Sequence, residues 1–181
     1  MPAELTVARL AEDGARPPHE WLAEVRPRER APAGRPFLFL NMVTSADGRA
    51  ALDGHTQALG SETDTLLLTE LRTLADAVLI GPGTLRAEGY GHLMRNPERL
   101  ARRRDAGLAP VPTAVVFSRS FDLPWDAGLF AAEGQPVLVY TRSDAQPPPV
   151  AADLEVARTR TSDAFVREGA LDRVRGGHGA A

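Results

Sequence analysis

Two hydroxyl groups flank a guanidinium in the segment Ser118–Ser120, which directly follows the apolar run Val115–Phe117. Hydroxyl and guanidinium groups form strong hydrogen bonds to phosphate, so this cluster could bind a phosphate monoester. The same residue types are also typical of a solvated polar turn, and composition alone does not decide between the two. All 21 Lys and Arg positions of the chain are arginine, so any phosphate contact must use guanidinium, hydroxyl or backbone N–H groups.

A second candidate binding segment is the string GPGTLRAEGY at Gly81–Tyr90. Gly81 and Gly83 would let the backbone approach a ligand closely, and a helix that opens at Thr84 would present unpaired N–H groups to an anion. The segment matches neither a dinucleotide fingerprint nor a P-loop, and glycine-containing turns between a strand and a helix are common. On its own it is weak support for a site.

A third candidate lies in the string NMVTSADGRA, where Thr44 and Ser45 stand beside an Asp47–Gly48 turn. Their hydroxyls could contact a ligand, although composition favours an ordinary turn at the end of a strand. Farther on, Asp64 follows Ser61 by three positions, which is the spacing of a capping box at the start of a helix.

Composition excludes several other kinds of site. The chain contains no cysteine, which rules out disulfides, thiolate metal ligands and cysteine nucleophiles, and its four histidines show no ligand-like spacing. We therefore expect no metal cofactor. The net charge of −3 argues against nucleic-acid binding.

The distribution of apolar residues is that of a globular protein, with 43% hydrophobic and 25% charged residues. No apolar run approaches the roughly 20 residues that cross a membrane, and acidic residues precede the first hydrophobic stretch, unlike in a secretory signal. The expected compartment is the cytoplasm.

The elements that would position these clusters follow from periodicity. The segment 37–43 is an apolar run made of Phe37, Leu38, Phe39, Leu40, Met42 and Val43, which predicts a strand buried on both faces. Leucines at helical spacing, with Ser61 as N-cap, predict a helix over Glu62–Leu74. Residues 1–36 are rich in Pro and Arg and predict an irregular arm, with at most a short helical turn near residues 19–25, before one domain over residues 37–181.

Further short apolar runs predict strands at residues 77–80, 115–117, 137–140 and 154–157. Helices are expected from Thr84, at the surface over residues 97–104, and over residues 163–175. Alternating strands and helices predict an α/β domain with a largely parallel sheet. In such sheets ligands bind at the carboxyl ends of the strands, where all three clusters would lie.

Residues 35 to about 145 resemble, in order, the reductase domain of the pyrimidine reductases of riboflavin biosynthesis. GRPFLFLNMVTSADGRA resembles the family's first strand and S-L-D-G-R turn, with Ala46 in place of leucine. LRTLADAVLIGPGTLRAEGYGHLMR resembles the L-R-x-x-x-D-A stretch and the G-x-x-T turn that follows, with Glu88 where aspartate is usual. AVVFSRS resembles the third strand and its turn.

The resemblance implies a dihydrofolate-reductase-like three-layer α/β domain and NADPH as cofactor. It assigns NADPH contacts to Thr44, Thr84, Glu88 and Ser118, and places Arg119 near the adenosine 2′-phosphate. We add Gly83 for its close backbone approach.

For the substrate, the resemblance matches Arg72 and Arg95 to binding positions. Arg72 would equally complement the dipole of its helix, and Arg95 lies in an arginine-rich stretch. In the wider dihydrofolate-reductase-like class, a carboxylate at the position of Asp64 faces the heterocycle, so Asp64 is the catalytic candidate. A capping role is about as well supported.

The implied reaction is NADPH-dependent reduction of a ribosylamino-pyrimidine phosphate to its ribityl form. We expect a homodimer that acts on this small molecule and binds neither nucleic acid nor membrane. Two alternatives stay open: a catalytically silent nucleotide-binding remnant of the family, and a folate or pteridine reductase, which Asp64 and Asn41 favour.

Members of the family continue into a strand and an E-G-G-P-x-L segment that this sequence lacks. Gly176 and Gly177 have neither the preceding strand nor the following proline, so they are not equivalent to the family's glycine pair. We therefore expect a chain whose C-terminal strands are missing, with exposed apolar sheet edges and marginal stability.

Overall fold

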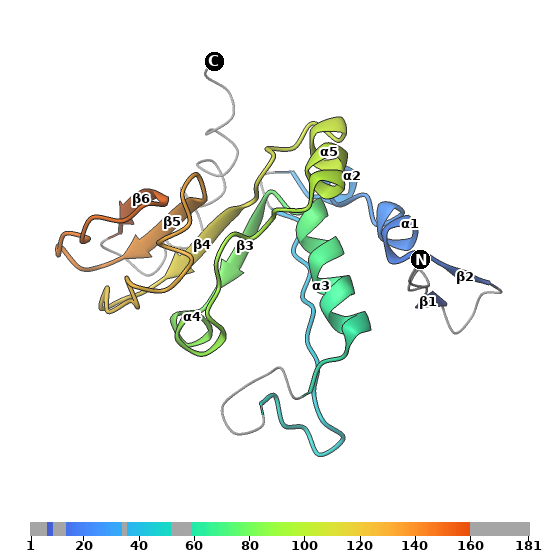
Figure 1. Cartoon of the computed structure of the whole chain (residues 1–181), viewed down its shortest axis with the longest axis horizontal. Coiled ribbons are helices and arrows are strands. Elements are labelled where there is room, and N and C mark those ends of the chain that lie inside the picture. Colours follow the sequence, from blue (N-terminus) through green and yellow to red (C-terminus); the bar gives the residue numbers. More distant parts are fainter. Residues whose placement is uncertain (1–6, 9–13, 34–35, 52–58, 160–181) are drawn as a thin grey trace. The chain divides into compact units, whose positions relative to one another are not determined.

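A computed structural model describes residues 7–8, 14–33, 36–51 and 59–159 of the chain (Figure 1). It divides into two compact units, Met1–Leu74 and Ala75–Ala181, and each is described by itself. The helix expected over residues 163–175 and the glycine pair at 176–177 lie outside the described residues.

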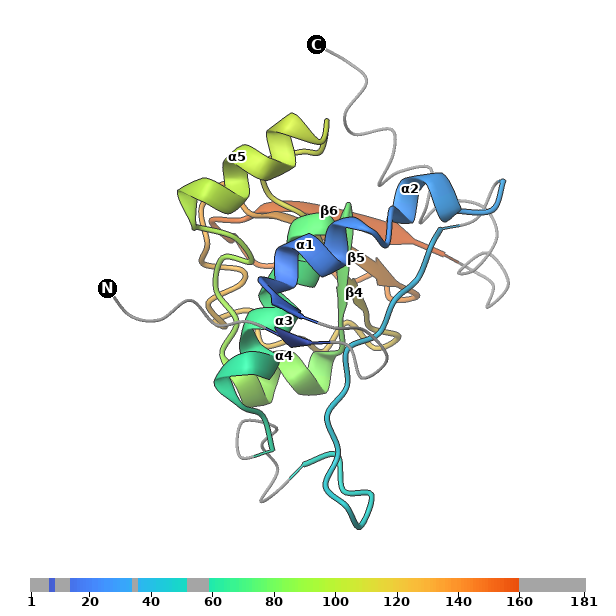
Figure 2. The same cartoon turned by 90° about the vertical axis from the view of Figure 1, so that its right-hand side faces the viewer.

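The first unit contains short elements and one longer helix. Strand β1 (Val7–Ala8) pairs with β2 (Ala15–Arg16) in an antiparallel ribbon, and α1 (Pro18–Ala23) and α2 (Pro27–Arg30) follow. The short helical turn predicted near residues 19–25 is thus present as α1, whereas α2 was not predicted. Both helices begin with proline, whose fixed φ suits the first helical position. Helix α1 packs against α3 (Glu62–Leu74) (Figure 2).

Helix α3 has the predicted bounds. The backbone N–H of Asp64 donates to the Ser61 hydroxyl at 3.2 Å, which confirms Ser61 as the residue that caps the helix. Thr69 and Thr73 return their hydroxyls to the backbone carbonyls four residues earlier, at 2.8 and 3.0 Å. The threonines therefore satisfy their own hydroxyls inside the helix.

The strand expected over residues 37–43 is absent from the described structure, so this prediction was wrong. The segment is extended but pairs with no described strand. Its side chains alternate: Phe37 and Phe39 are half-buried, whereas Leu38 and Leu40 are each 83% exposed. An apolar run becomes a strand only where neighbouring chains supply hydrogen bonds and a second face, and neither is present among the residues described.

The second unit is built on a parallel sheet of four described strands, in the order β3–β4–β5–β6 (Figure 1). Their bounds are Ala77–Ile80, Thr113–Phe117, Pro136–Thr141 and Asp153–Arg158. All four match predicted strands to within two residues. The α/β class with a parallel sheet is confirmed.

The two faces of the sheet follow the period of two in each strand. Val116 and Val139 point to one face, where they join Leu85 of α4 (Pro82–Glu88) and Phe130 in the main apolar cluster. Side chains of the alternate positions form a smaller cluster on the other face, in which Tyr140 stacks on Phe117 with ring centroids 5.1 Å apart.

Helix α5 (Pro97–Asp105) was predicted as a surface helix, but one of its arginines is fully buried. The Arg103 guanidinium donates through Nε to the Ala109 carbonyl at 2.8 Å and through Nη1 to the Ala75 carbonyl at 2.7 Å. Burying a charge is costly unless hydrogen bonds compensate it, and these carbonyls offset part of that cost at Nε and Nη1. Arg103 thereby ties the helix to the entrances of β3 and β4.

Gln135 has a comparable role in the turn before β5. Its side chain is fully buried, accepts a hydrogen bond from the Leu93 N–H at 2.9 Å and donates to the Pro112 carbonyl at 3.0 Å. The amide joins the segment after α4 to the start of β4. The sheet and its connections are therefore fixed by buried polar contacts as well as by apolar packing.

Candidate functional site

The carboxyl ends of the four parallel strands meet at one edge of the sheet, the usual ligand edge of an α/β fold. Residues 81–84, 118–120 and 142–143 leave the sheet there, after β3, β4 and β5. The Ser118 N–H still donates to the Tyr140 carbonyl at 2.9 Å, so the turn after β4 starts directly at the sheet edge. Two of the three predicted clusters, at residues 81–90 and 118–120, thus follow the paired strands β3 and β4 within one unit.

Ser118 and Arg119 differ in their surroundings. Ser118 is 5% exposed, whereas Arg119 is exposed and its guanidinium makes no hydrogen bond or ion pair with the described residues. A guanidinium in this state can bind an anion without first breaking a contact.

The predicted residues of α4 occupy its two ends. Gly81 is the N-cap and lacks a side-chain cap, so the first N–H groups of the helix, including those of Gly83 and Thr84, receive no such partner. A Cβ at Gly83 would meet nothing within 4 Å, so the described structure itself does not require glycine there. Glu88 lies at the last helical residue, about 6 Å along the axis from Thr84, and has contacts of its own.

The two arginines predicted to bind substrate lie in different units. Arg95 is exposed in the segment before α5 and has no polar contact with the described residues. Arg72 is half-buried in the last turn of α3 and is already engaged. Arg95 is therefore available to a ligand, whereas Arg72 already has a contact within the protein.

Asp64, the catalytic candidate, meets Asn41 from the extended segment of the first unit. The Asn41 side-chain amide donates to Oδ1 of Asp64 at 3.0 Å. Since the helix cap is supplied by the Ser61 hydroxyl, the Asp64 carboxylate is directed toward residue 41. The two residues that favoured a folate-type reductase are brought together by the fold.

Thr44 is exposed and immediately precedes a tight turn over Ser45–Arg49. The Gly48 N–H donates to the Ser45 carbonyl at 2.9 Å, and Gly48 adopts a φ of +81°, a conformation that glycine reaches without steric cost. The turn expected from the Asp-Gly pair is confirmed.

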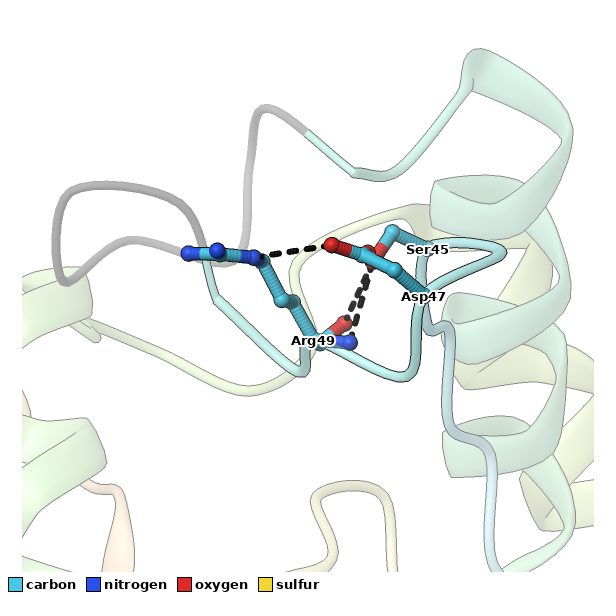
Figure 3. Close-up of polar contacts among 3 residues, drawn as sticks. All are labelled: Ser45, Asp47 and Arg49. Atoms are coloured by element: carbon cyan, nitrogen blue, oxygen red, sulfur yellow. Dashed lines mark hydrogen bonds and ion pairs between the residues drawn. The ribbon is translucent and has the colours of Figure 1, made fainter.

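Side chains reinforce this turn (Figure 3). The Ser45 hydroxyl donates to the Asp47 carboxylate, and Arg49 Nε donates to the same carboxylate at 3.0 Å. The hydrogen bond from Ser45, followed by that from Arg49, lowers the pKa of Asp47 below its ordinary value. The turn was predicted from the Asp-Gly pair, whereas the ion pair between Asp47 and Arg49 was not, although the D-G-R string could have indicated it.

Sequence reasoning also missed a contact between Arg86 and Asp122, 36 positions apart in the chain. No local pattern predicts such a pairing. Within the part of the chain that the structure describes, no group of three or more potential metal ligands occurs, and no helix is long and apolar enough to cross a membrane.

Comparison with known proteins identifies the family. The model of the RibD C-terminal domain matches residues 36–168. The riboflavin biosynthesis protein RibD of Mycobacterium tuberculosis is 33% identical over an alignment of 172 residues that covers 91% of this chain and 47% of that protein. The 2,5-diamino-6-ribosylamino-4(3H)-pyrimidinone 5′-phosphate reductase of Archaeoglobus fulgidus is 27% identical over 109 residues, which cover 60% of this chain and 50% of that protein.

The fold agrees with this assignment. The crystal structure of a pyrimidine reductase-like protein from Corynebacterium diphtheriae has a TM-score of 0.59 and 26% identity, covering 75% of this chain and 59% of that chain. The chain spans about half the length of the curated relatives it matches. Family model, relatives and fold agree: the chain belongs to the RibD C-terminal domain family of riboflavin-biosynthesis pyrimidine reductases.

Proposed function

We propose that this chain takes part in the NADPH-dependent reduction of a ribosylamino-pyrimidine phosphate to its ribityl form. The observation that carries the proposal is the exposed Arg119 guanidinium, which has no polar contact with the described residues and lies next to Ser118 at the carboxyl edge of the sheet. The chain belongs to a reductase family. The relative from Archaeoglobus fulgidus is named for a reductase of such a phosphate.

The donor set of the second unit suits a phosphorylated dinucleotide. Ser118, Thr84 and the uncapped N–H groups at the start of α4 are neutral donors, and Arg119 adds a positive charge, as a 2′-phosphate requires. When bound, reduced nicotinamide supplies the reducing electrons as hydride. The chain's own residues need only bind the cofactor and hold donor and acceptor in alignment.

In this proposal Gly83 gives the cofactor close access to the backbone, and Thr44 and Glu88 are further cofactor contacts. Arg95 and Arg72 bind the phosphorylated substrate. Asp64, held by Asn41 at 3.0 Å, faces the heterocycle. We further propose that the protein works as a homodimer in the cytoplasm.

The test is a titration of the purified chain with NADPH and, separately, NADH, followed by a turnover assay on the ribosylamino-pyrimidine phosphate. Preferential binding of NADPH together with turnover supports the proposal. Binding without turnover would favour the second candidate, a nucleotide-binding protein without catalysis. Binding of neither cofactor would refute the proposed cofactor.

A folate or pteridine reductase is the third candidate, because the structure places the Asn41 amide on the Asp64 carboxylate. A carboxylate held in this way can donate and accept protons at a nitrogen heterocycle. Turnover of dihydrofolate that an antifolate inhibits, without turnover of the pyrimidine phosphate, would favour this candidate over the pyrimidine reductase.

A further inference from the structure

The turn after β4 has an unusual backbone. Phe121 adopts a φ of +65°, in the left-handed region that bulky side chains rarely enter. Its ring is buried and meets Trp125 edge-on, with centroids 4.9 Å apart. Such a conformation persists only when its surroundings hold it, so other contacts must fix this turn. The turn begins with Ser118 and Arg119, the residues proposed to bind phosphate.

Arg86 of α4 supplies such a contact. Its Nη2 donates to the backbone carbonyl of Asp122 at 2.7 Å and to the Asp122 carboxylate at 3.1 Å. Leu85, the neighbouring residue in α4, is buried in the same apolar cluster as Phe121. The turn is therefore held on one side by the core and on the other by the guanidinium.

The two contacts of Arg86 are not equal. The Arg86 and Asp122 side chains are 46% and 83% exposed, and ion pairs between exposed groups contribute little. The shorter bond to the carbonyl instead fixes the peptide group between Asp122 and Leu123, one residue beyond Phe121. The backbone contact is accordingly the one that restrains the turn.

We propose that Arg86 is a positioning residue for cofactor binding: by holding the carbonyl of Asp122, it keeps the turn over residues 118–122 in the conformation that presents Arg119 to phosphate. This inference rests on the proposed function. Arg86 itself need not touch the ligand.

The experiment compares four variants of the full chain with wild type. Arg86→Ala removes both contacts, Arg86→Lys keeps a donor for the carbonyl, and Asp122→Asn keeps the carbonyl while removing the carboxylate charge. Arg104→Ala is the control, since Arg104 is an exposed helical arginine of the same unit whose side chain makes no polar contact with the described residues. Each variant is measured by hydrogen exchange without ligand and by titration with NADPH and NADH.

We expect Arg86→Ala to speed exchange across residues 118–124 about tenfold and to weaken NADPH binding about tenfold, with little change for NADH. Exchange in β5 should not change, which shows that the sheet is intact. Arg86→Lys should restore most of both effects, and Asp122→Asn and Arg104→Ala should resemble wild type.

Unchanged exchange over residues 118–124 in Arg86→Ala would overturn the inference, whatever the titrations show. Equal weakening of NADPH and NADH would overturn the link between Arg86 and Arg119. If wild type binds neither cofactor, the proposed function fails, and the exchange data still report separately on whether Arg86 holds the turn.

Discussion

Arg119 is one exposed side chain, yet the proposed choice of cofactor depends on it. NADPH and NADH differ only in the 2′-phosphate, so a single guanidinium at that phosphate is enough to discriminate between them. Arg119 keeps this capacity because it has no polar contact with the described part of the chain.

Arg119→Ala should weaken NADPH binding by about 1.5–3 kcal/mol, the usual value of a hydrogen bond to a charged group, and leave NADH binding nearly unchanged. Fluorescence titration of each cofactor measures this, with Arg104→Ala as the matched control. Equal losses for the two cofactors would remove Arg119 from the 2′-phosphate.

Asp47 gives a prediction about pH. The pKa of Asp47 is lowered in the folded turn, chiefly by the hydrogen bond from the Ser45 hydroxyl. The ionised carboxylate therefore contributes fully to the stability of the fold above the ordinary carboxyl pKa of about 4, and this contribution is lost as the pH falls through the lowered pKa. Ser45→Ala should therefore raise the pKa of Asp47, as followed by the carbon chemical shift of its carboxyl group. An unchanged titration would show that Ser45 is not the main cause.

At the scale of elements, one loop approaches another closely enough to exclude any side chain. A Cβ at Gly128 would lie 2.9 Å from the backbone carbonyl oxygen of Tyr90, whereas a Cβ at Gly91 would meet nothing within 4 Å. Neither glycine has a positive φ, so the difference is one of space alone.

Gly128→Ala should lower the free energy of unfolding by about 1–3 kcal/mol, because backbone must shift to admit the methyl group. Gly91→Ala is the control and should change stability little. Urea unfolding of both variants makes the comparison. Equal free energies of unfolding for the two variants would mean that the backbone around Tyr90 shifts at no cost to admit the methyl group.

Elements with complete local signals were predictable from the sequence. Helix α3 was found from its leucine spacing and the Ser61 cap, and the four strands of the sheet from short apolar runs between turns. The segment 37–43 misled because its apolar run says nothing about whether partner strands are present. The buried Arg103 misled for a similar reason, since its carbonyl partners lie outside its own helix.

In the candidate site, too, features with a local sequence signal were predictable and features that depend on distant partners were not. Ser118 and Arg119 could be named from residue types at a strand end, whereas the contact of Arg86 with Asp122 depends on how α4 lies against the turn after β4. The left-handed Phe121 was equally hidden, because aromatic residues do not favour that conformation. Long-range geometry decides such features, and a single sequence does not encode it locally.

At the scale of the whole molecule, large apolar side chains are exposed in both units. Leu38, Leu40 and Met42 alternate along the extended segment of the first, and Leu79 lies on β3, an edge strand among those described, in the second. Exposed apolar rows of this kind promote association with other chains.

The double variant Leu38→Lys with Leu40→Lys should bind less of a hydrophobic dye and show weaker concentration-dependent association in sedimentation velocity. Ala51→Lys, at an exposed position just after the Ser45–Arg49 turn, controls for added positive charge. Association that responds equally to both changes would reflect net charge instead of the apolar row.

The placement of the two tryptophans has a practical consequence for spectroscopy. Trp21 is buried in the first unit beneath the Arg16 guanidinium, 3.6 Å from the ring centroid, and Trp125 packs between Phe121 and Phe130 in the second. Since the sequence has no other tryptophan, each unit contains its own fluorophore. Trp21→Phe and Trp125→Phe would let the emission of the remaining indole follow one unit at a time, so that ligand binding and unfolding can be assigned to each unit separately.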